Sequence, residues 1–209
     1  TVTPVPIGTI KHIVKNQGNG GANGVLFAQD SNGRIWAGNA SNIYLILVPG
    51  NNLAATNGNG IVIHAFSSTA ATYLFVFRNG AIDVLNVHTT ATFFGATSWT
   101  ASSQTLNTAS GTNNSHHAIV GQDNIIYFVD ARFVGSIKEN SGSTFDPATS
   151  STYTYNNQAL DTPSGEILNW LEELGTYLLA AGDKYAKIYP WNRLADSFEL
   201  PIPVPENAV

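Results

Sequence analysis

Apolar and polar residues alternate along this chain in short runs that end in turn-forming residues. Four stretches share one order: an apolar strand, a turn rich in Asn, Asp and Gly, and a second strand of apolar and aromatic residues. This order is typical of β-hairpins, because Asn and Gly tolerate the positive φ angles of tight two-residue turns. The pattern therefore predicts four hairpins, at residues 26–36, 74–84, 118–128 and 178–189.

The predicted hairpins recur at similar intervals. If Ile35, Ile82, Ile126 and Ile188 are equivalent positions, the steps between them are about 47, 44 and 62 residues, close to the period of propeller blades. One blade cannot bury its own apolar faces, so such units are stable only when they stack side by side. We therefore predict an all-β chain, a β-propeller of about four four-stranded antiparallel blades.

We predict that residues 1–209 form a single domain or segment that contains four repeated units. They cover approximately residues 8–50, 60–100, 102–140 and 165–205, with a polar segment at 139–163 predicted to be a loop insertion. Inserted loops of repeat proteins often gather on the binding face, although an outer-edge excursion without a ligand is the commoner case. In the third unit, strands are expected at 103–107, 117–121, 125–129 and, as the outer strand, 133–137.

The segment 165–175 permits two interpretations. Its acidic residues, leucine spacing and final glycine suit a short helix. Its place in the repeat favours a strand, which is the preferred interpretation. Residues alternate between the two faces of a strand, so one face would carry Ile167, Asn169 and Leu171, and the other Leu168, Trp170 and Glu172.

Two similar proline-rich stretches, 3–8 and 201–206, fall where one blade would pass to the next. Propellers usually contain four to eight blades. The four units are then either a closed ring of four blades or part of a larger ring, and the larger ring is the preferred interpretation.

The amino-acid composition indicates in which kind of protein this fold would occur. Only 11% of the residues are charged while 43% are apolar, and Asn, Ser, Thr and Gly supply the polarity. This composition suits turn-rich β-structure and an assembled, extracellular or virion-like protein. The net charge of −5, with nine scattered Lys and Arg residues, offers no basic footprint for nucleic acid. No apolar run is long enough to predict insertion into a membrane, and the absence of cysteine excludes thiolate chemistry.

The stretch 30–38, Asp-Ser-Asn-Gly-Arg-Ile-Trp-Ala-Gly, resembles the hairpin of sensor-type and lyase-type β-propellers. The Asn-, Thr- and Ser-rich style, together with the stretches 145–147, 159–163 and 189–193, resembles propeller domains in virion proteins of tailed bacteriophages. Those domains are structural or host-recognition parts of the tail or neck. The resemblance implies a virion or extracellular location and other protein subunits as partners.

Candidate chemistry is sparse. His116 and His117 are adjacent in a predicted strand, so their rings point to opposite faces and do not readily share a metal ion. Glycoside hydrolysis needs two carboxylates a few ångströms apart, whereas several aspartates here fall in predicted turns, where Asp often bonds its own backbone. We assign no catalytic residue, no metal site and no cofactor.

Three aromatic residues, Trp99, Tyr153 and Tyr155, are the candidate ligand-binding residues. They lie among Ser and Thr in predicted outer or loop regions, and aromatic rings offer large contact areas to glycans and proteins at low entropic cost. Burial between blades is the competing interpretation. For the other tryptophans, Trp36, Trp170 and Trp191, packing in the core is expected.

The leading hypothesis is a non-catalytic structural and interaction module, a virion tail or neck component that binds neighbouring subunits in a homo- or hetero-oligomer. Within binding functions, the runner-up is recognition of a host-surface glycan or protein through residues 139–163. From another class, the alternative is a polysaccharide lyase or glycoside hydrolase of propeller fold. Because low charge reduces the desolvation cost of large interfaces, isolated chains are expected to self-associate or to join a complex.

Overall fold

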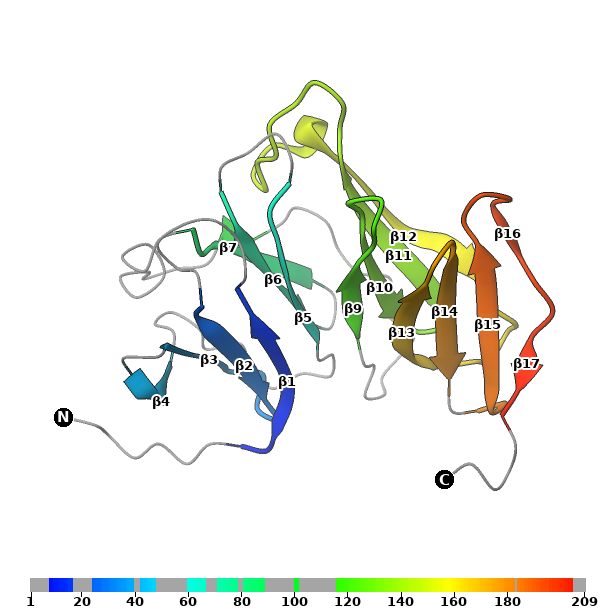
Figure 1. Cartoon of the computed structure of the whole chain (residues 1–209), viewed down its shortest axis with the longest axis horizontal. Coiled ribbons are helices and arrows are strands. Elements are labelled where there is room, and N and C mark those ends of the chain that lie inside the picture. Colours follow the sequence, from blue (N-terminus) through cyan, green and yellow to red (C-terminus); the bar gives the residue numbers. More distant parts are fainter. Residues whose placement is uncertain are drawn as a thin grey trace.

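The computed structural model of the chain describes residues 8–16, 24–39, 42–47, 60–66, 71–78, 81–88, 100–101, 116–182 and 184–204. Apart from one short 3-10 helix, the regular structure within these ranges is all β. The strands form four antiparallel sheets, which fan out from a shared centre (Figure 1). The predicted architecture, a four-bladed β-propeller of all-β class, is confirmed.

Each sheet is one blade, and its strands follow one another in chain order from the innermost to the outermost. Blade 1 contains β1 (Ile10–Lys15), β2 (Leu26–Asp30), β3 (Ile35–Asn39) and β4 (Asn42–Leu47). Blade 2 contains β5 (Gly60–His64), β6 (Tyr73–Arg78), β7 (Ala81–Asn86) and β8 (Thr100–Ala101).

The second half of the chain forms two further blades. Blade 3 contains β9 (Ala118–Val120), β10 (Ile126–Asp130), β11 (Phe133–Glu139) and β12 (Tyr153–Asp161), with the helix η1 (Ser150–Thr152) before β12. Blade 4 contains β13 (Leu168–Leu174), β14 (Tyr177–Gly182), β15 (Lys187–Asn192) and β16 (Ser197–Phe198), and β17 (Ile202–Pro203) also pairs with β15.

Consecutive blades hold together through apolar faces. The innermost strands touch in sequence: β1 contacts β5, β5 contacts β9, and β9 contacts β13. Around them, side chains from neighbouring sheets form three apolar clusters, one for each pair of consecutive blades. Their fully buried members include Phe27 and Leu74 between blades 1 and 2, Phe77 and Phe128 between blades 2 and 3, and Val129 and Leu171 between blades 3 and 4.

Glycine permits a close approach between blades 2 and 3. An added Cβ at Gly60, on β5, would lie 1.7 Å from the carbonyl oxygen of His116, at the start of blade 3. Within blade 3, a Cβ at Gly135 would lie 2.2 Å from the Phe128 ring. The two glycines therefore allow the backbone and the aromatic ring to fill the space between blades 2 and 3.

The four blades form an open fan. Each apolar cluster of the described residues joins consecutive blades, and none joins blade 4 to blade 1. In Figure 1 the sheets occupy the left, upper and right parts of the view, and none of the described strands lies on the lower side between β1 and β17. The sequence allows either a closed ring of four blades or part of a larger ring, and an open fan suits the larger ring. The presence of further blades that complete the ring stays a prediction.

Blade 3 differs from the prediction in its strand numbering. The segment 139–163 is not wholly a loop insertion, because it contains the outermost strand β12, and residues 133–137 belong to the third strand. The hairpin 118–128 consequently supplies strands one and two of its blade, so Ile126 is not equivalent to Ile35, Ile82 and Ile188. The expected strand at 103–107 lies outside the described residues.

The segment 168–174 is the strand β13, as preferred from the repeat, but its faces differ from the expected alternation. The register shifts between Leu168 and Trp170, because a β-bulge inserts one extra residue into the strand. Leu168 and Leu171 therefore both point into the core between blades 3 and 4. Beyond the bulge, Trp170 and Glu172 lie on the opposite face, which is exposed.

Candidate functional site

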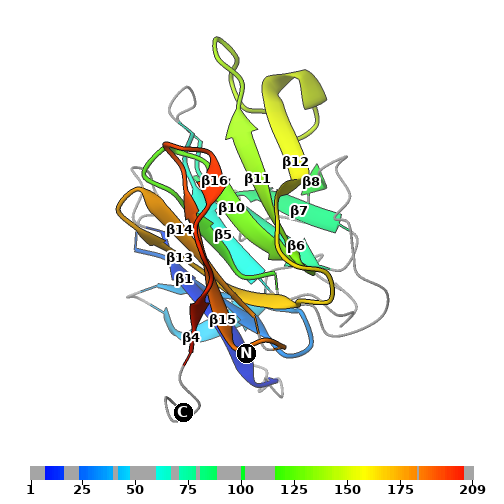
Figure 2. The ribbon, with the colours of Figure 1, turned by 90° about the vertical axis from the view of Figure 1, so that its right-hand side faces the viewer.

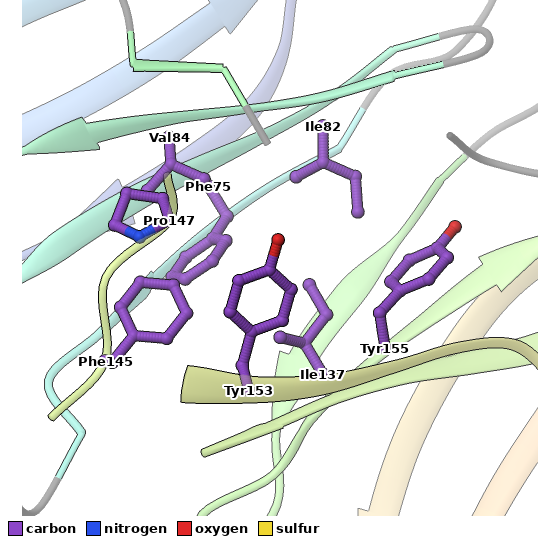
Figure 3. Close-up of a pocket in the computed structure, with 8 residues that line it drawn as sticks. All are labelled: Phe75, Ile82, Val84, Ile137, Phe145, Pro147, Tyr153 and Tyr155. Carbon is purple, nitrogen blue, oxygen red and sulfur yellow. The ribbon is translucent and has the colours of Figure 1, made fainter. Parts of the chain in front are cut away.

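Two of the three candidate aromatic residues lie at the start of β12, and Trp99 lies outside the described residues. Tyr153 is only 4% exposed, and the Tyr155 ring stacks on Phe128 with 6.0 Å between the ring centroids. Both rings point from blade 3 toward blade 2 in Figure 3, where they line a crevice with Phe75, Ile82, Val84, Ile137, Phe145 and Pro147.

The crevice around these tyrosines is small. Its free volume is about 10 Å³, which is the space of about one water molecule. Tyr153 and Tyr155 therefore contribute to packing between blades 2 and 3, and no sugar ring fits between them in this arrangement. A ligand-binding role for Trp99, Tyr153 and Tyr155 stays a prediction.

The loop between β11 and β12 projects at the top of the molecule (Figures 1 and 2) and is shaped by its own polar groups. The Asp146 carboxylate accepts hydrogen bonds from the Thr149 hydroxyl (2.7 Å) and the Ala148 amide (3.0 Å), and these bonds lower the pKa of Asp146. The side-chain amide nitrogen of Asn140 donates a hydrogen bond to the Ser151 carbonyl, and the side-chain oxygen of Asn140 accepts one from the Thr154 hydroxyl at 2.6 Å. These bonds hold the loop in a defined shape.

A polar cleft lies between this loop and the turn that joins β9 to β10. Its volume is about 500 Å³, and it is open to solvent. The cleft is large enough for a small polar ligand, and it is lined by Asp123, Asn124, Lys138, Glu139, Asn140, Ser141, Gly142, Ser143 and Thr144.

Beside the cleft, Arg193 connects blade 4 to blade 3. Its guanidinium pairs with Asp123 at 3.1 Å and with Glu173, and it donates to the Gly175 carbonyl at 2.6 Å. The Asp123 carboxylate also accepts a 2.7 Å hydrogen bond from the Tyr127 hydroxyl. Burial and this bond raise the pKa of Tyr127. The carboxylates of Asp123 and Glu173 therefore help to join the two blades.

Two buried carboxylates, Asp30 and Glu166, fix turns of the blades. Asp30 accepts hydrogen bonds from the backbone of Asn32 (2.8 Å) and from the side chains of Arg34 (2.9 Å) and Trp36 (3.1 Å). Burial alone would raise the pKa of Asp30, but the bond from Trp36 and those from Arg34 and Asn32 outweigh it, so the pKa is lowered.

Glu166 has the same role in blade 4. It accepts from the Tyr189 hydroxyl at 2.7 Å and from the backbone amides of Ile167 and Lys184, each at 3.1 Å. Both carboxylates thus have structural partners.

His116 and His117 precede β9 rather than lying in a strand, as the sequence predicts, and they occupy different environments. His116 is fully buried between blades 2 and 3, and its Nδ1 lies 2.9 Å from the Val129 carbonyl oxygen. Burial lowers the pKa of His116 to about 4. His117 instead accepts a hydrogen bond from the Leu171 amide and stacks near Trp170. Within the described ranges, no three His, Cys, Asp or Glu side chains gather as a metal site would require.

The face of blade 4 that points away from blade 3 is apolar and exposed. Cross-strand pairing places Trp170, Ala181, Ile188 and Ile202 in one row over β13, β14, β15 and β17. Trp170 is 41% exposed and Ile202 is 51% exposed. We call this surface the outer face of blade 4 and include Glu172, Leu174 and Leu179, which lie on the same side of the sheet.

This outer face was missed from the sequence, and the expected core packing of Trp170 was wrong. Trp36 is buried, and Trp191 packs against the cluster between blades 3 and 4, as expected. Trp170 differs because β13 turns it away from the apolar cluster between blades 3 and 4, so that it stays 41% exposed with the centroid of the His117 ring 6.2 Å from that of its own. The available signal was the alternation of side chains in β13, which places Trp170 on the face opposite to the buried Leu171. To use this signal, one would have had to know where the bulge lies and that the fan is open.

Comparisons with known proteins support the fold alone. No family model matches the sequence, and no curated protein matches it. Similar solved structures include the nidogen/laminin complex (TM-score 0.56, 12% identity, 97% of this chain and 66% of that chain) and streptogramin B lyase (TM-score 0.57, 13% identity, 99% and 58%). Another is YCF48 from Cyanidioschyzon merolae (TM-score 0.50, 12% identity, 95% and 61%).

These similarities define the chain as a β-propeller protein. It spans about three-fifths of the length of these similar chains. Among its own described residues, no helix has the length and apolar character needed to cross a membrane.

Proposed function

We propose that the chain is a non-catalytic interaction module that assembles with other protein subunits through the outer face of blade 4. The observation that carries this proposal is the exposure of Trp170 and Ile202 on an apolar sheet face. Contiguous exposed apolar surface commonly marks a protein–protein interface, and aromatic residues often dominate the energy of such interfaces.

Four of the described carboxylates support the same proposal. A hydrolase or lyase needs carboxylates or other groups that are available to a substrate. Here Asp30 and Glu166 hold turns, and Asp123 and Glu173 bind Arg193. The likeness to streptogramin B lyase, at 13% identity, extends to the fold only.

We further propose that the chain is located in a virion tail or neck, where the module would bind neighbouring subunits. This part of the proposal rests on the low charge and the Asn-, Ser- and Thr-rich composition of the chain, together with its resemblance to phage propeller domains. Such a location would place the outer face of blade 4 inside an assembly.

Hydroxyl-radical footprinting tests the docking role even while the partner subunit is unidentified. The oxidation of Trp170 and Ile202 is compared between the purified, dilute chain and the same chain within its native assembly. We expect several-fold protection of both residues in the assembly, whereas Leu194, which is exposed in the turn after β15, serves as the internal control. Equal oxidation of Trp170 in the two samples would contradict the proposal.

The polar cleft of blade 3 supports a second candidate function, recognition of a host-surface glycan. Its volume of about 500 Å³ and its hydrogen-bonded loop give a preformed polar surface, and preformed sites lose less entropy on binding. Titration with a panel of defined oligosaccharides tests this role. A Lys138→Ala variant should bind more weakly than the wild type, while Lys187→Ala, on blade 4, should bind normally.

A further inference from the structure

The innermost strands of the blades contact one another in a regular way. Each presents apolar side chains to the next: Val14 of β1 meets the cluster that contains Ile61 and Ile63 of β5. The pattern repeats in the other two interfaces, with Val62 facing Ala118 and Val120, and Ile119 facing Leu168 and Leu171. An innermost strand therefore has an incoming face toward the previous blade and an outgoing face toward the next.

The first and last innermost strands each have one face outside this series. On β1, the face opposite to Val14 carries Ile13 and Lys15, both exposed, with Ile13 at 60%. Lys11 is left out of this face, because the register shifts between Ile10 and His12 and leaves Lys11 unpaired. On β13, the face opposite to Leu171 carries Trp170, Glu172 and Leu174, all exposed, with Leu174 at 65%. On each of these faces, a charged residue lies two positions from an apolar one.

The two exposed faces are complementary. In β1 a cation lies beside an apolar side chain, and in β13 two apolar side chains flank an anion. Laid side by side as in the other interfaces, β13 and β1 would place Glu172 near Lys15, with Ile13 near the apolar residues of β13. Complementary charge fixes the register of an interface and suppresses wrong pairings.

We propose that the outer face of blade 4 binds β1 of a second copy of this chain, head to tail. This inference rests on the proposed docking role of that face and names its partner. The chain's own blade 1 is not the occupant in this structure, because no apolar cluster of the described residues joins blade 4 to blade 1. Such a contact uses different surfaces on the two copies, so it leaves one face free on each and permits a ring or an open array.

Charge reversal tests the pairing with the complete chain. Glu172→Lys gives a copy with cations on both faces, and Lys15→Glu gives a copy with anions on both. Each variant alone should associate about tenfold more weakly than the wild type, because like charges face one another. In an equimolar mixture every interface is again complementary, so the mixture should associate as the wild type does.

Sedimentation velocity over a range of concentrations and at two salt concentrations provides the readout. Wild-type association should weaken in high salt, because exposed charges are screened. Lys138→Glu, a matched reversal at an exposed lysine of blade 3, should associate normally. Circular dichroism verifies that the variants fold, which is expected since all the altered side chains are exposed.

The outcomes separate this inference from the docking role itself. A wild-type chain that stays monomeric at all concentrations overturns the pairing of copies, while footprint protection of Trp170 in the native assembly would still support docking to another partner. Association that is lost in Trp170→Ser but unchanged by both charge reversals overturns the pairing with β1 and retains the outer face. A mixture of reversed variants that fails to associate also overturns it.

Discussion

Blades 3 and 4 have the same strand order but differ in how their faces are covered. On the side of blade 3 that faces blade 4, Tyr127, Val129, Val134 and Leu160 are at most 7% exposed. On the corresponding side of blade 4, Trp170 and Ile202 are about half exposed. Both blades place apolar side chains on two faces, so the difference comes from the neighbour and not from the strand pattern.

The comparison indicates where the chain is most and least supported. The stability of a protein built from stacked repeats is approximately the sum of the stabilities of the individual repeats and of the interfaces between neighbours. Blade 3 has two described interfaces, whereas blade 4 has one. Substitutions between blades 2 and 3 should therefore cost much more than substitutions on the outer face of blade 4.

The largest expected effect is at Phe128, which is fully buried between blades 2 and 3 and lies 5.0 Å from the Phe77 ring. Phe128→Ala should lower the free energy of unfolding by about 3–5 kcal/mol, because it removes apolar contacts and leaves a cavity. Urea denaturation measures this loss. A cost below about 1 kcal/mol, similar to that of Leu194→Ala on an exposed turn, would contradict the packing described for blade 3.

Burial of histidine between blades 2 and 3 gives the second effect. Burial lowers the pKa of both His64 and His116 to about 4, from 6.5. Below pH 6.5 the unfolded chain binds protons that the folded chain does not, so the free energy of unfolding should fall as the pH drops toward 4. The loss is on the order of 2–3 kcal/mol for each histidine.

Urea midpoints between pH 7 and pH 4.5 test this dependence. In His116→Asn the side-chain amide can still donate to the Val129 carbonyl but does not titrate in this range. The decrease in stability with falling pH should therefore become smaller by the roughly 2–3 kcal/mol that His116 supplies, while His64 and His117, whose pKa values burial also lowers, still contribute. An unchanged pH dependence in this variant would show that His116 is not the buried neutral group.

The sequence predicted the class of fold because the hairpin pattern repeats along the whole chain. It did not number the strands of blade 3, since an apolar–turn–apolar pattern is the same for the first and second pair of a blade. Asp30 and Asp130 end β2 and β10, the second strands of their blades. Aligning these two aspartates, rather than Ile35 with Ile126, would have given the correct numbering.

The binding surfaces were less accessible to prediction for a physical reason. The burial of Tyr153 depends on Phe145, which the loop between β11 and β12 places 5.5 Å away. The exposure of Trp170 depends on a bulge in β13 and on the absence of a covering blade among the described residues. Neither feature is encoded in local alternation, which fixes the face of a side chain but not what lies against it.

The connection between blades 3 and 4 should show an intermediate effect. Arg193→Met keeps most of the aliphatic side chain but removes the ion pairs with Asp123 and Glu173. Because these groups are partly exposed, the expected loss of stability is about 1 kcal/mol. Hydrogen exchange should quicken in β13 and β14 and stay unchanged in β10 and β11. Faster exchange throughout both blades would contradict a local connection.

The smallest effect is expected on the outer face of blade 4. Trp170→Ala removes a half-exposed ring from a face that no described blade covers, so the free energy of unfolding should change by less than about 1 kcal/mol. The adjacent residue gives the matched control, since Leu171 is fully buried against blade 3 and Leu171→Ala should cost about 2–5 kcal/mol. Urea denaturation of both variants at low protein concentration, where association is minimal, measures the difference. Equal costs for these two neighbours would mean that both faces of β13 are covered, and the contrast between blades 3 and 4 would then be lost.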